Sequence, residues 1–528
     1  MSRVLSLLVA LVACAAACAP ANATSLIVPD DSPTIQGALD AHPDTVLVRG
    51  GSYQESPVLY ARVALLGIPG GAGFERPVVS GMTLGSSWTS PGFVADFLVR
   101  DVEFGGQVYI HNQDGSSQVV LDHCRLQAGI QESSESPESS QLTLRGCVID
   151  QDVLYADGFI VVDDCIFRGG HLVVAGDDCD LTVTNSEFHG DGTRSAIAAV
   201  NGIHDARITG NLLEGYGGGI FLEVTGTVRI EDNVLRDMQA SGMGLHGASV
   251  HVIRNKLERC IGRYSYGINA EGTDALVVTG NTIANCGGSG MLAIVSSQGT
   301  IVDNVVWGCG FYGIHLGGDA GGLLEVKNNT SCLNGLNGFQ SECWVNGGRY
   351  EFEGNIGFGN GRYGVEWGVP EVSAVRCNDW FGNGLGAVSG LPMSSEDRSV
   401  DPQFCNAANG DFRLASTSPL VSPPGCGQVG ALGVGCTGTS RLTVLGQNPS
   451  RGPVRIEFEL GVPAAIEIDV FDLQGRRVAS LAHGTWPAGT HAVEWAGRSG
   501  STRLAVGMYV VRYRHPGGED KRRIVLTP

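Results

Sequence analysis

The chain has 528 residues, with 34 Lys and Arg against 54 Asp and Glu, and a formal net charge of −20. This length is enough for two or three domains. The excess of acid argues against nucleic acid and anionic membranes as partners, because phosphate recognition requires clustered Lys and Arg. After the N-terminal segment, no apolar run approaches the roughly 20 residues that span a bilayer, so no transmembrane span is expected in the mature chain.

The N-terminus predicts export. Arg3 gives a positive start, Val4–Ala13 is an apolar run, and Ala21-Asn22-Ala23 offers a small-x-small cleavage site. Residues 1–23 are therefore interpreted as a signal peptide. The alternative is lipidation, because Leu11-Val12-Ala13-Cys14 resembles a bacterial lipobox and would give an outer-membrane lipoprotein. Either route predicts an extracellular or cell-surface location.

An Asn, followed in most coils by an apolar residue two positions later, recurs through the middle of the chain at steps of 22 to 26 residues. It stands at Asn211, Asn233, Asn255, Asn281, Asn304, Asn329, Asn355 and Asn378. Upstream, the same slot holds Cys124, Cys147, Cys165 and Ser186. A second slot, five residues later, holds Cys260, Cys286, Cys309, Asn334, Asn360 and Asn383.

Short alternating runs rich in Val and Ile separate these marks, and such runs are typical of half-buried strands. Three short strands per ~23 residues describe one coil of a parallel β-helix, with coils stacked at the ~4.8 Å strand spacing. Each repeated residue would then stack on its own copy, so the Asn side chains would hydrogen-bond along a column and Cys would be a small apolar filler. A metal or disulfide cluster at Cys124, Cys147 and Cys165 is the alternative, although zinc ligands usually lie two to four residues apart.

These repeats resemble those of the right-handed parallel β-helix (pectate-lyase-like) superfamily, and Val28–Ser56 resembles the entry segment of that family. The resemblance implies a short helix, capped near Ser32 or Thr34, that closes the open end of the stack. It also implies a β-helix over residues 24–436, cap segments included. The superfamily contains lyases, hydrolases, esterases, adhesins and stalks, so the resemblance does not decide the activity.

The repeat ends in a Pro/Gly/Ser-rich segment, Asp401–Cys436. The best disulfide candidates are Cys377, Cys405, Cys426 and Cys436, with the pairing undetermined. Residues 437–528 then alternate with turns every 8–12 residues, which predicts a small Ig-like β-sandwich of about seven strands. The fold class is therefore all-β: a right-handed parallel β-helix solenoid followed by a small sandwich.

The last segment also resembles the Ig-like domain of flagellar hook-cap proteins and the C-terminal sorting domain of type IX secretion cargo. The residues that carry this resemblance are Asp472, Gly475, Arg476, Arg477, Gly489, His491, Trp495, Gly507, Tyr509 and Lys521–Leu526. It implies sorting or anchoring, with secretion or surface-attachment machinery as the partner.

Outward strand positions are where a β-helix would carry a site. The sequence places Glu223, His246 and Glu271 on three consecutive coils, and two carboxylates beside an imidazole suit acid–base catalysis or a bound cation. These three are the catalytic candidates. The binding candidates, on neighbouring outward positions or beside them, are Tyr266, Tyr312, His315, Gln340, Tyr363, Glu366 and Trp367. A further column, Lys327, Glu353 and Arg376, alternates in sign and is interpreted as a charge ladder.

The motifs of galacturonan hydrolases are present only in part. Asp177-Asp178-Cys179 resembles their second element, His246-Gly247 lacks a preceding Gly, and Arg254-Asn255-Lys256 matches the fourth element loosely. The sequence thus predicts a surface or secreted protein that binds polysaccharide or acts as a displayed scaffold or adhesin. The alternative is a polysaccharide lyase or glycoside hydrolase acting on an acidic glycan, and the sequence does not decide whether the chain is an enzyme. No metal site is predicted; Ca²⁺ is the one cofactor left open.

Overall fold

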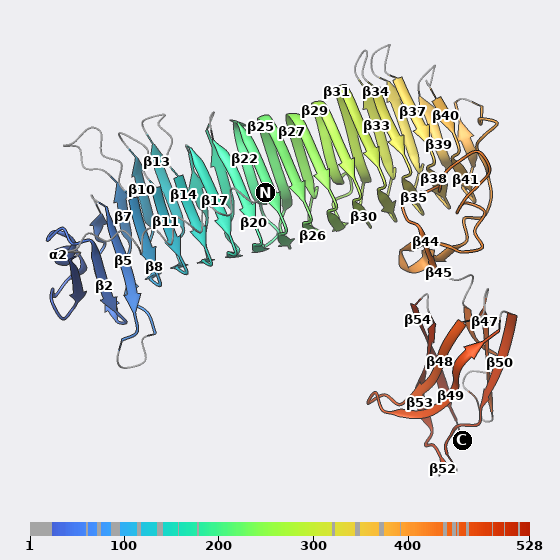
Figure 1. Cartoon of the computed structure of the whole chain (residues 1–528). Helices are drawn as coiled ribbons and strands as arrows, with labels where there is room; N and C mark the ends of the chain where they lie inside the picture. The colour runs from blue at the N-terminus through green and yellow to red at the C-terminus, as the bar shows by residue number, and fades with distance from the viewer. Residues whose placement is uncertain are drawn as a thin grey trace. The chain divides into compact units, whose positions relative to one another are not determined.

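The structure is a computed structural model, and Figure 1 shows the whole chain. The described residues are 24–59, 62–70, 75–85, 96–112, 118–134, 141–156, 158–176, 179–318, 323–343, 349–368, 374–390, 392–436, 441–445, 450, 453–460, 464–487, 489–500, 502–515 and 518–527. The predicted signal peptide and lipobox therefore lie outside them. The chain divides into two units, Met1–Gln298 and Gly299–Pro528, which are described separately.

The first unit is a parallel β-solenoid, as the repeat predicts. One group of strands pairs coil to coil along its length: β1 (Ser25–Val28), β2 (Thr45–Arg49), β5 (Val63–Ile68), β8 (Asp96–Arg100), β11 (Gln118–Asp122), β14 (Gln141–Arg145), β17 (Phe159–Asp163), β20 (Asp180–Thr184) and β23 (Asp205–Thr209). A second group comprises β4 (Val58–Leu59), β7 (Met82–Gly85), β10 (Val108–Asn112), β13 (Ile130–Ser134), β16 (Val153–Tyr155), β19 (Leu172–Ala175) and β22 (Ser195–Ile203). The third comprises β3 (Ser52–Tyr53), β6 (Val78–Val79), β9 (Glu103–Phe104), β12 (Arg125–Leu126), β15 (Val148–Ile149), β18 (Ile166–Arg168), β21 (Glu187–His189), β24 (Leu212–Glu214), β26 (Val234–Met238), β28 (Lys256–Cys260) and β30 (Thr282–Ala284).

Later coils of this unit differ from the prediction of three short strands. The first two groups merge there into single long strands, β25 (Gly218–Glu231), β27 (Met243–Ile253) and β29 (Tyr266–Thr279), and β31 (Ser289–Val302) contains the unit boundary. The register shifts between Val224 and Thr227, so the corner is a bulge inside a continuous strand.

The N-terminal end is closed by the predicted helix, α2 (Ile35–Leu39). Thr34 is its N-cap, and its hydroxyl accepts from the Gly37 amide at 3.0 Å. The Glu55 carboxylate accepts from the first two amides of the helix, those of Ile35 at 3.0 Å and Gln36 at 3.1 Å. Within the described residues, no helix is long and apolar enough to cross a membrane.

The second unit continues the parallel pattern and then changes. Its solenoid strands are β32 (Val305–Trp307), β33 (Ile314–Gly318), β34 (Leu323–Lys327), β35 (Thr330–Cys332), β36 (Phe339–Cys343), β37 (Arg349–Glu353), β38 (Ile356–Phe358), β39 (Tyr363–Gly368), β40 (Ala374–Arg376), β41 (Asp379–Phe381) and β42 (Gly386–Ser389). A small sheet follows, with β43 (Phe404–Asn406), β44 (Asp411–Ala415) and β45 (Val434–Cys436).

The predicted Asn column is present in each unit. In the first, Asn211 Nδ2 donates to Asn233 Oδ1 at 2.9 Å, and Asn233 Nδ2 donates to Asn255 Oδ1 at 2.9 Å. Asn255 Nδ2 reaches Asn281 Oδ1 at 3.1 Å. The second unit repeats this bond along Asn304, Asn329, Asn355 and Asn378. A second column runs through Cys309, Asn334, Asn360 and Asn383.

Upstream cysteines occupy the same slot as the Asn column. Cys124, Cys147 and Cys165 are buried free thiols, so no disulfide joins them. Cys124 Sγ donates to the Val99 carbonyl at 3.5 Å, and burial raises the pKa of this thiol. These side chains behave as the small apolar filler that the sequence predicts. Cys260 and Cys286 are also buried and are not disulfide-bonded.

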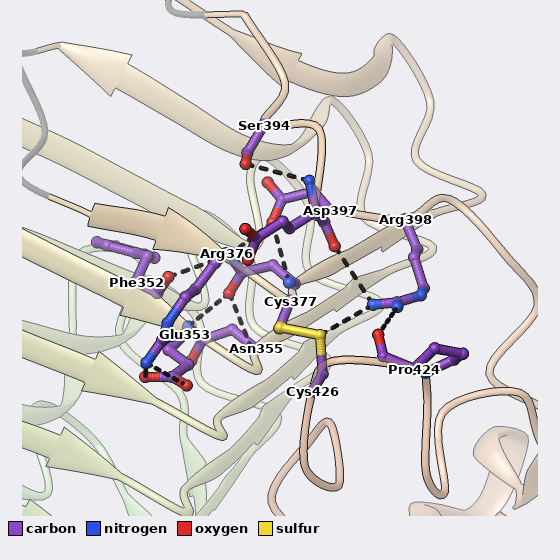
Figure 2. Close-up of a disulfide and its surroundings, with 12 residues drawn as sticks. Phe352, Glu353, Asn355, Arg376, Cys377, Ser394, Asp397, Arg398, Pro424 and Cys426 are labelled. Atoms are coloured by element: carbon purple, nitrogen blue, oxygen red, sulfur yellow. Dashed lines mark hydrogen bonds and ion pairs between the residues drawn. A yellow bond between two sulfur atoms is a disulfide. The ribbon is translucent and has the colours of Figure 1, made fainter.

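All four cysteines named as candidates form disulfides, in a pairing that the sequence did not determine. Cys377 joins Cys426, and Cys405 joins Cys436. Figure 2 shows the first bridge beside Asp397, whose Oδ1 accepts from Asn378 Nδ2 at 3.0 Å. The carboxylate of Asp397 therefore ends the Asn column of this unit.

Residues from Arg441 onward form two small antiparallel sheets. Their strands are β46 (Arg441–Leu445), β47 (Val454–Leu460), β48 (Ala464–Phe471), β49 (Arg477–Trp486), β50 (Gly489–Trp495), β53 (Gly507–His515) and β54 (Gly518–Leu526), with a hairpin of β51 (Arg498–Ser499) and β52 (Thr502–Arg503). They share one buried apolar core that includes Trp495 and Tyr513. Asp472 closes a turn by accepting from the Arg476 amide at 3.0 Å, and Gly475 there has a φ of +78°. The predicted fold class is confirmed; the boundaries 24–436 and 437–528 and the sorting role stay predictions.

Candidate functional site

Outward positions of the long strands form columns, as the alternation predicts. In the first unit, Phe221 pairs with Gly244 and Gly244 with Asn269. In the second, His315 pairs with Gln340 and Gln340 with Glu366. Each set of three lies side by side on neighbouring parallel strands, one coil apart.

The catalytic candidates lie one step along the strands of the first unit. Glu223 pairs directly with His246. The register between β27 and β29 shifts after Leu245, so His246 and Glu271 are not paired in register. Glu223 and Glu271 are exposed and His246 is half-buried. Within the described residues, these three side chains form no hydrogen bond or ion pair with one another, and their role stays a prediction.

In the second unit, the side-chain amide of a buried Asn donates hydrogen bonds to two outward polar groups. Asn337 is fully buried, and its Nδ2 donates to Gln340 Oε1 and to Glu366 Oε2, each at 2.7 Å. Its Oδ1 accepts from the Tyr363 amide at 3.0 Å. One side chain thus fixes two outward groups from adjacent strands. Tyr312, His315, Asn337, Gln340, Glu342 and Glu366 are called the Asn337 cluster below.

An imidazole and an aromatic ring complete the Asn337 cluster. His315 Nε2 lies 3.4 Å from Glu342 Oε2, and the Tyr312 and His315 rings make an edge contact at 5.1 Å. Gln340 is 5% exposed, and its Nε2 has no protein partner in the described part of the chain. Glu366 Oε1 is likewise unbonded within those residues. A free donor and a free acceptor therefore stand beside an aromatic ring on one outward face.

Burial and the two carboxylates set the protonation of this cluster. Burial lowers the pKa of His315, although the nearby Glu342 carboxylate opposes the change. Burial also raises the pKa of Tyr312, and the carboxylates of Glu342 and Glu366 raise it further. The phenol therefore keeps its proton, and the imidazole favours its neutral form.

Two aromatic candidates, Tyr363 and Tyr266, have side chains that are not part of the Asn337 cluster. The prediction that Trp367 is a binding residue is wrong. Tyr363 is half-buried, with the Arg362 guanidinium 5.8 Å from its ring centroid. Tyr266 is half-buried on β29 of the first unit. Trp367 does not offer an exposed ring for stacking on a sugar. It is 6% exposed, and its ring centroid lies 4.6 Å from that of Phe352. It follows the outward Glu366 by one residue, so strand alternation turns it into the core.

Sequence reasoning missed Asn337, the residue that organises this cluster. It lies three positions after Asn334, outside the repeat slots, and no copy of it marks the other coils. Glu342 lies on the same strand as Gln340, two positions later, but was not among the candidates from the sequence. The available signal was local: an Asn just before the Gly338–Phe339 pair that begins a strand.

One group of metal-type ligands exists among the described residues. Asp180, His204 and Asp205 bring one ligand atom each within 4.8 Å of the others. Their atoms already bond within the corner, because Asp180 Oδ1 accepts from the Asp205 amide at 3.0 Å and Asp205 Oδ1 from the Thr227 amide at 2.6 Å. The arrangement is accounted for as turn capping. Asp177 and Asp178, of the hydrolase-like motif, lie outside the described residues.

The predicted charge ladder is in register, since Lys327 pairs with Glu353 and Glu353 with Arg376. Arg376 bonds Glu353 at 2.9 Å, whereas Lys327 lies 3.2 Å from Glu325 and 3.6 Å from Glu351. A groove of about 330 Å³ beside this ladder is lined by Lys327, Asn328, Glu353, Gly354, Cys377, Cys426, Gly427, Gln428 and Val429. The ladder is thus a set of surface ion pairs on the solenoid.

Comparison with a family model supports the solenoid fold. Residues 195–356, from the start of β22 to the start of β38, match the family model described as "Right handed beta helix region". A search of curated proteins found no match. Among solved structures, the chain is similar to tailspike protein 3 (TSP3, orf212) of bacteriophage CBA120, with 15% sequence identity and a TM-score of 0.36. That similarity covers 71% of this chain and 59% of the tailspike chain, so the chain spans about three fifths of the tailspike's length.

Proposed function

We propose that this protein binds polysaccharide through the Asn337 cluster, as an exported or cell-surface protein. The observation that carries the proposal is the buried Asn337 amide, which holds Gln340 and Glu366 in place on an outward face. Fixed polar groups lose little conformational freedom when a ligand binds, so their hydrogen bonds contribute more to affinity.

The chemistry of the cluster suits a sugar. Sugar hydroxyls both donate and accept, and the cluster offers a donor at Gln340 Nε2 and acceptors on Glu342 and Glu366. The edge-on Tyr312 ring supplies an aromatic surface for the C–H face of a pyranose. Strands ~4.8 Å apart bring all these groups within the span of one or two sugar units.

Surface delivery is the second part of the proposal. Its support is the N-terminal export signal in the sequence and the C-terminal β domain, which has an apolar core of its own. We expect deletion from Leu442 onward to leave the β-helix folded and able to bind, but to abolish surface retention. A truncated chain that aggregates, or that is retained as well as the full chain, would contradict the sorting role.

A glycan array with the mature chain, followed by calorimetry on the hits, tests the binding function. We expect binding that Glu366→Gln and Tyr312→Ala weaken. Assays for reducing ends and unsaturated uronates on the same hits test the lyase or hydrolase alternative. No binding to any glycan would overturn the proposal, and sustained turnover would replace it with the enzymatic alternative.

A further inference from the structure

The charge of the Asn337 cluster points to a narrower ligand class. Two carboxylates belong to the cluster: Glu342 Oε2 lies 3.4 Å from His315 Nε2, and Glu366 Oε2 accepts from Asn337 Nδ2 at 2.7 Å. After burial, these two carboxylates are the next causes that raise the pKa of the Tyr312 phenol. The cation that acts on that phenol is Arg362, and its influence is smaller than that of either carboxylate. The imidazole of His315 adds little positive charge, because burial disfavours its protonated form. The face is therefore anionic.

We infer that the Asn337 cluster selects a cationic sugar, a hexosamine with a free amine, over a uronic acid; this inference rests on the proposed glycan binding. An ammonium group would donate charge-assisted hydrogen bonds to Glu366 and Glu342, which are stronger than bonds from a neutral hydroxyl. The same ammonium would be attracted to the face of the Tyr312 ring. A uronate carboxylate would instead meet like charge at short range.

Partial burial makes this selection local to the site. The side chain of Glu342 is 36% exposed and that of His315 is 15% exposed, so solvent screens their charges less than those of free surface groups. The chain as a whole carries a net charge of −20, which attracts any cation weakly and without holding it at a defined position. A test must therefore separate the cluster from the general field of the protein.

Three β-1,4-linked trisaccharides, of glucosamine, glucose and glucuronic acid, provide a matched ligand series that differs at one group per sugar. Calorimetry with the mature chain at about pH 6 and 0.15 M salt should rank glucosamine at least tenfold above glucose, with no measurable affinity for glucuronic acid. Glu342→Gln with Glu366→Gln should bring the glucosamine affinity down to the glucose value.

The control is Glu325→Gln with Glu351→Gln, which removes the same charge from another outward position of this unit. These residues pair on adjacent strands, and their side chains are 37% and 36% exposed, close to the value for Glu342. We expect this variant to keep the glucosamine preference. Circular dichroism and thermal unfolding establish that both variants fold.

Several results would overturn the inference and leave the proposed function standing. They are equal affinity for glucosamine and glucose, tighter binding of glucuronic acid, a glucosamine preference that survives in the Glu342→Gln, Glu366→Gln variant, or array hits confined to neutral or acidic glycans. Failure of every glycan on the array to bind would instead remove the proposed function itself.

Discussion

Two outward faces of the solenoid carry similar residue types but differ in the buried groups that bond them. The first face is that of β25, β27 and β29 in the first unit, and the second face is that of β33, β36 and β39 in the second unit. Glu223 and His246 pair in register, with no hydrogen bond or ion pair between these two described side chains. Gln340 and Glu366 also pair in register, and both are bonded by the buried Asn337. Residue type and spacing therefore do not distinguish the two faces. The buried Asn337 does, and we expect binding where outward side chains are fixed in this way.

The largest expected effect comes from removing that buried group. We expect Asn337→Leu to lower glycan affinity by about 100-fold, or about 2.8 kcal/mol, because Gln340 and Glu366 lose their shared donor. The Tyr363 amide also loses its acceptor, which should cost roughly 1–3 kcal/mol of unfolding free energy. Calorimetry and urea unfolding measure the two effects.

Asn233→Leu is the matched control for this change. It removes an equally buried amide from the Asn column of the first unit, so we expect a stability loss of roughly 1–3 kcal/mol or more with unchanged affinity per folded molecule. Equal loss of affinity in both variants would show that Asn337 acts only through stability.

A smaller effect is expected from the aromatic ring. Tyr312→Ala should weaken glycan binding by about tenfold, or about 1.4 kcal/mol, because the sugar loses its stacking surface. Tyr312→Phe should keep most of the affinity, since it retains the ring. A loss as large in the Phe variant would assign the role to the hydroxyl and would refute stacking.

His315 should make the unfolding free energy of the chain depend on pH. Its pKa lies below the ordinary value of 6.5 in the folded chain, because burial disfavours the charged imidazole. The unfolded chain then binds more protons below that value, so the stabilising free energy falls as pH drops through 6.5. Urea unfolding at pH 7.5 and 5 should show a smaller loss for His315→Gln than for the unchanged chain. An identical loss would mean that the imidazole is freely solvated.

The smallest effect is expected on the first face. Glu223→Gln combined with His246→Ala should change glycan affinity less than twofold and stability by less than about 0.5 kcal/mol, as for solvated surface groups. Glycan and Ca²⁺ titrations of this variant and of Glu271→Gln test the catalytic and cation-binding candidates together. A clear loss of binding, Ca²⁺ affinity or turnover would move the functional site to the first unit and reverse the comparison.

The repeat made most of the fold predictable. Asn233 and Asn255 recur at a fixed step, so their position in a stack follows from the period alone. The helix cap at Thr34 and the four disulfide cysteines follow from local sequence, but the pairing of the cysteines depends on how the chain folds back. The site was less predictable: Asn337 has no repeated counterpart, and the burial of Trp367 depends on exact strand phase. Isolated residues that act through three-dimensional contact leave no period to detect.

The Asn column of the second unit also has a direction. Every side-chain amide donates its N–H toward the next coil, from Asn304 through Asn329 and Asn355 to Asn378, so the amide dipoles point the same way. Aligned bonds of this kind polarise one another, and their positive end lies at Asn378. The acceptor there is the carboxylate of Asp397, a negative charge with no donor to pass on. The column is thus a row of aligned amide dipoles. The change from Asn to Asp at position 397 places a negative charge at the positive end of that row.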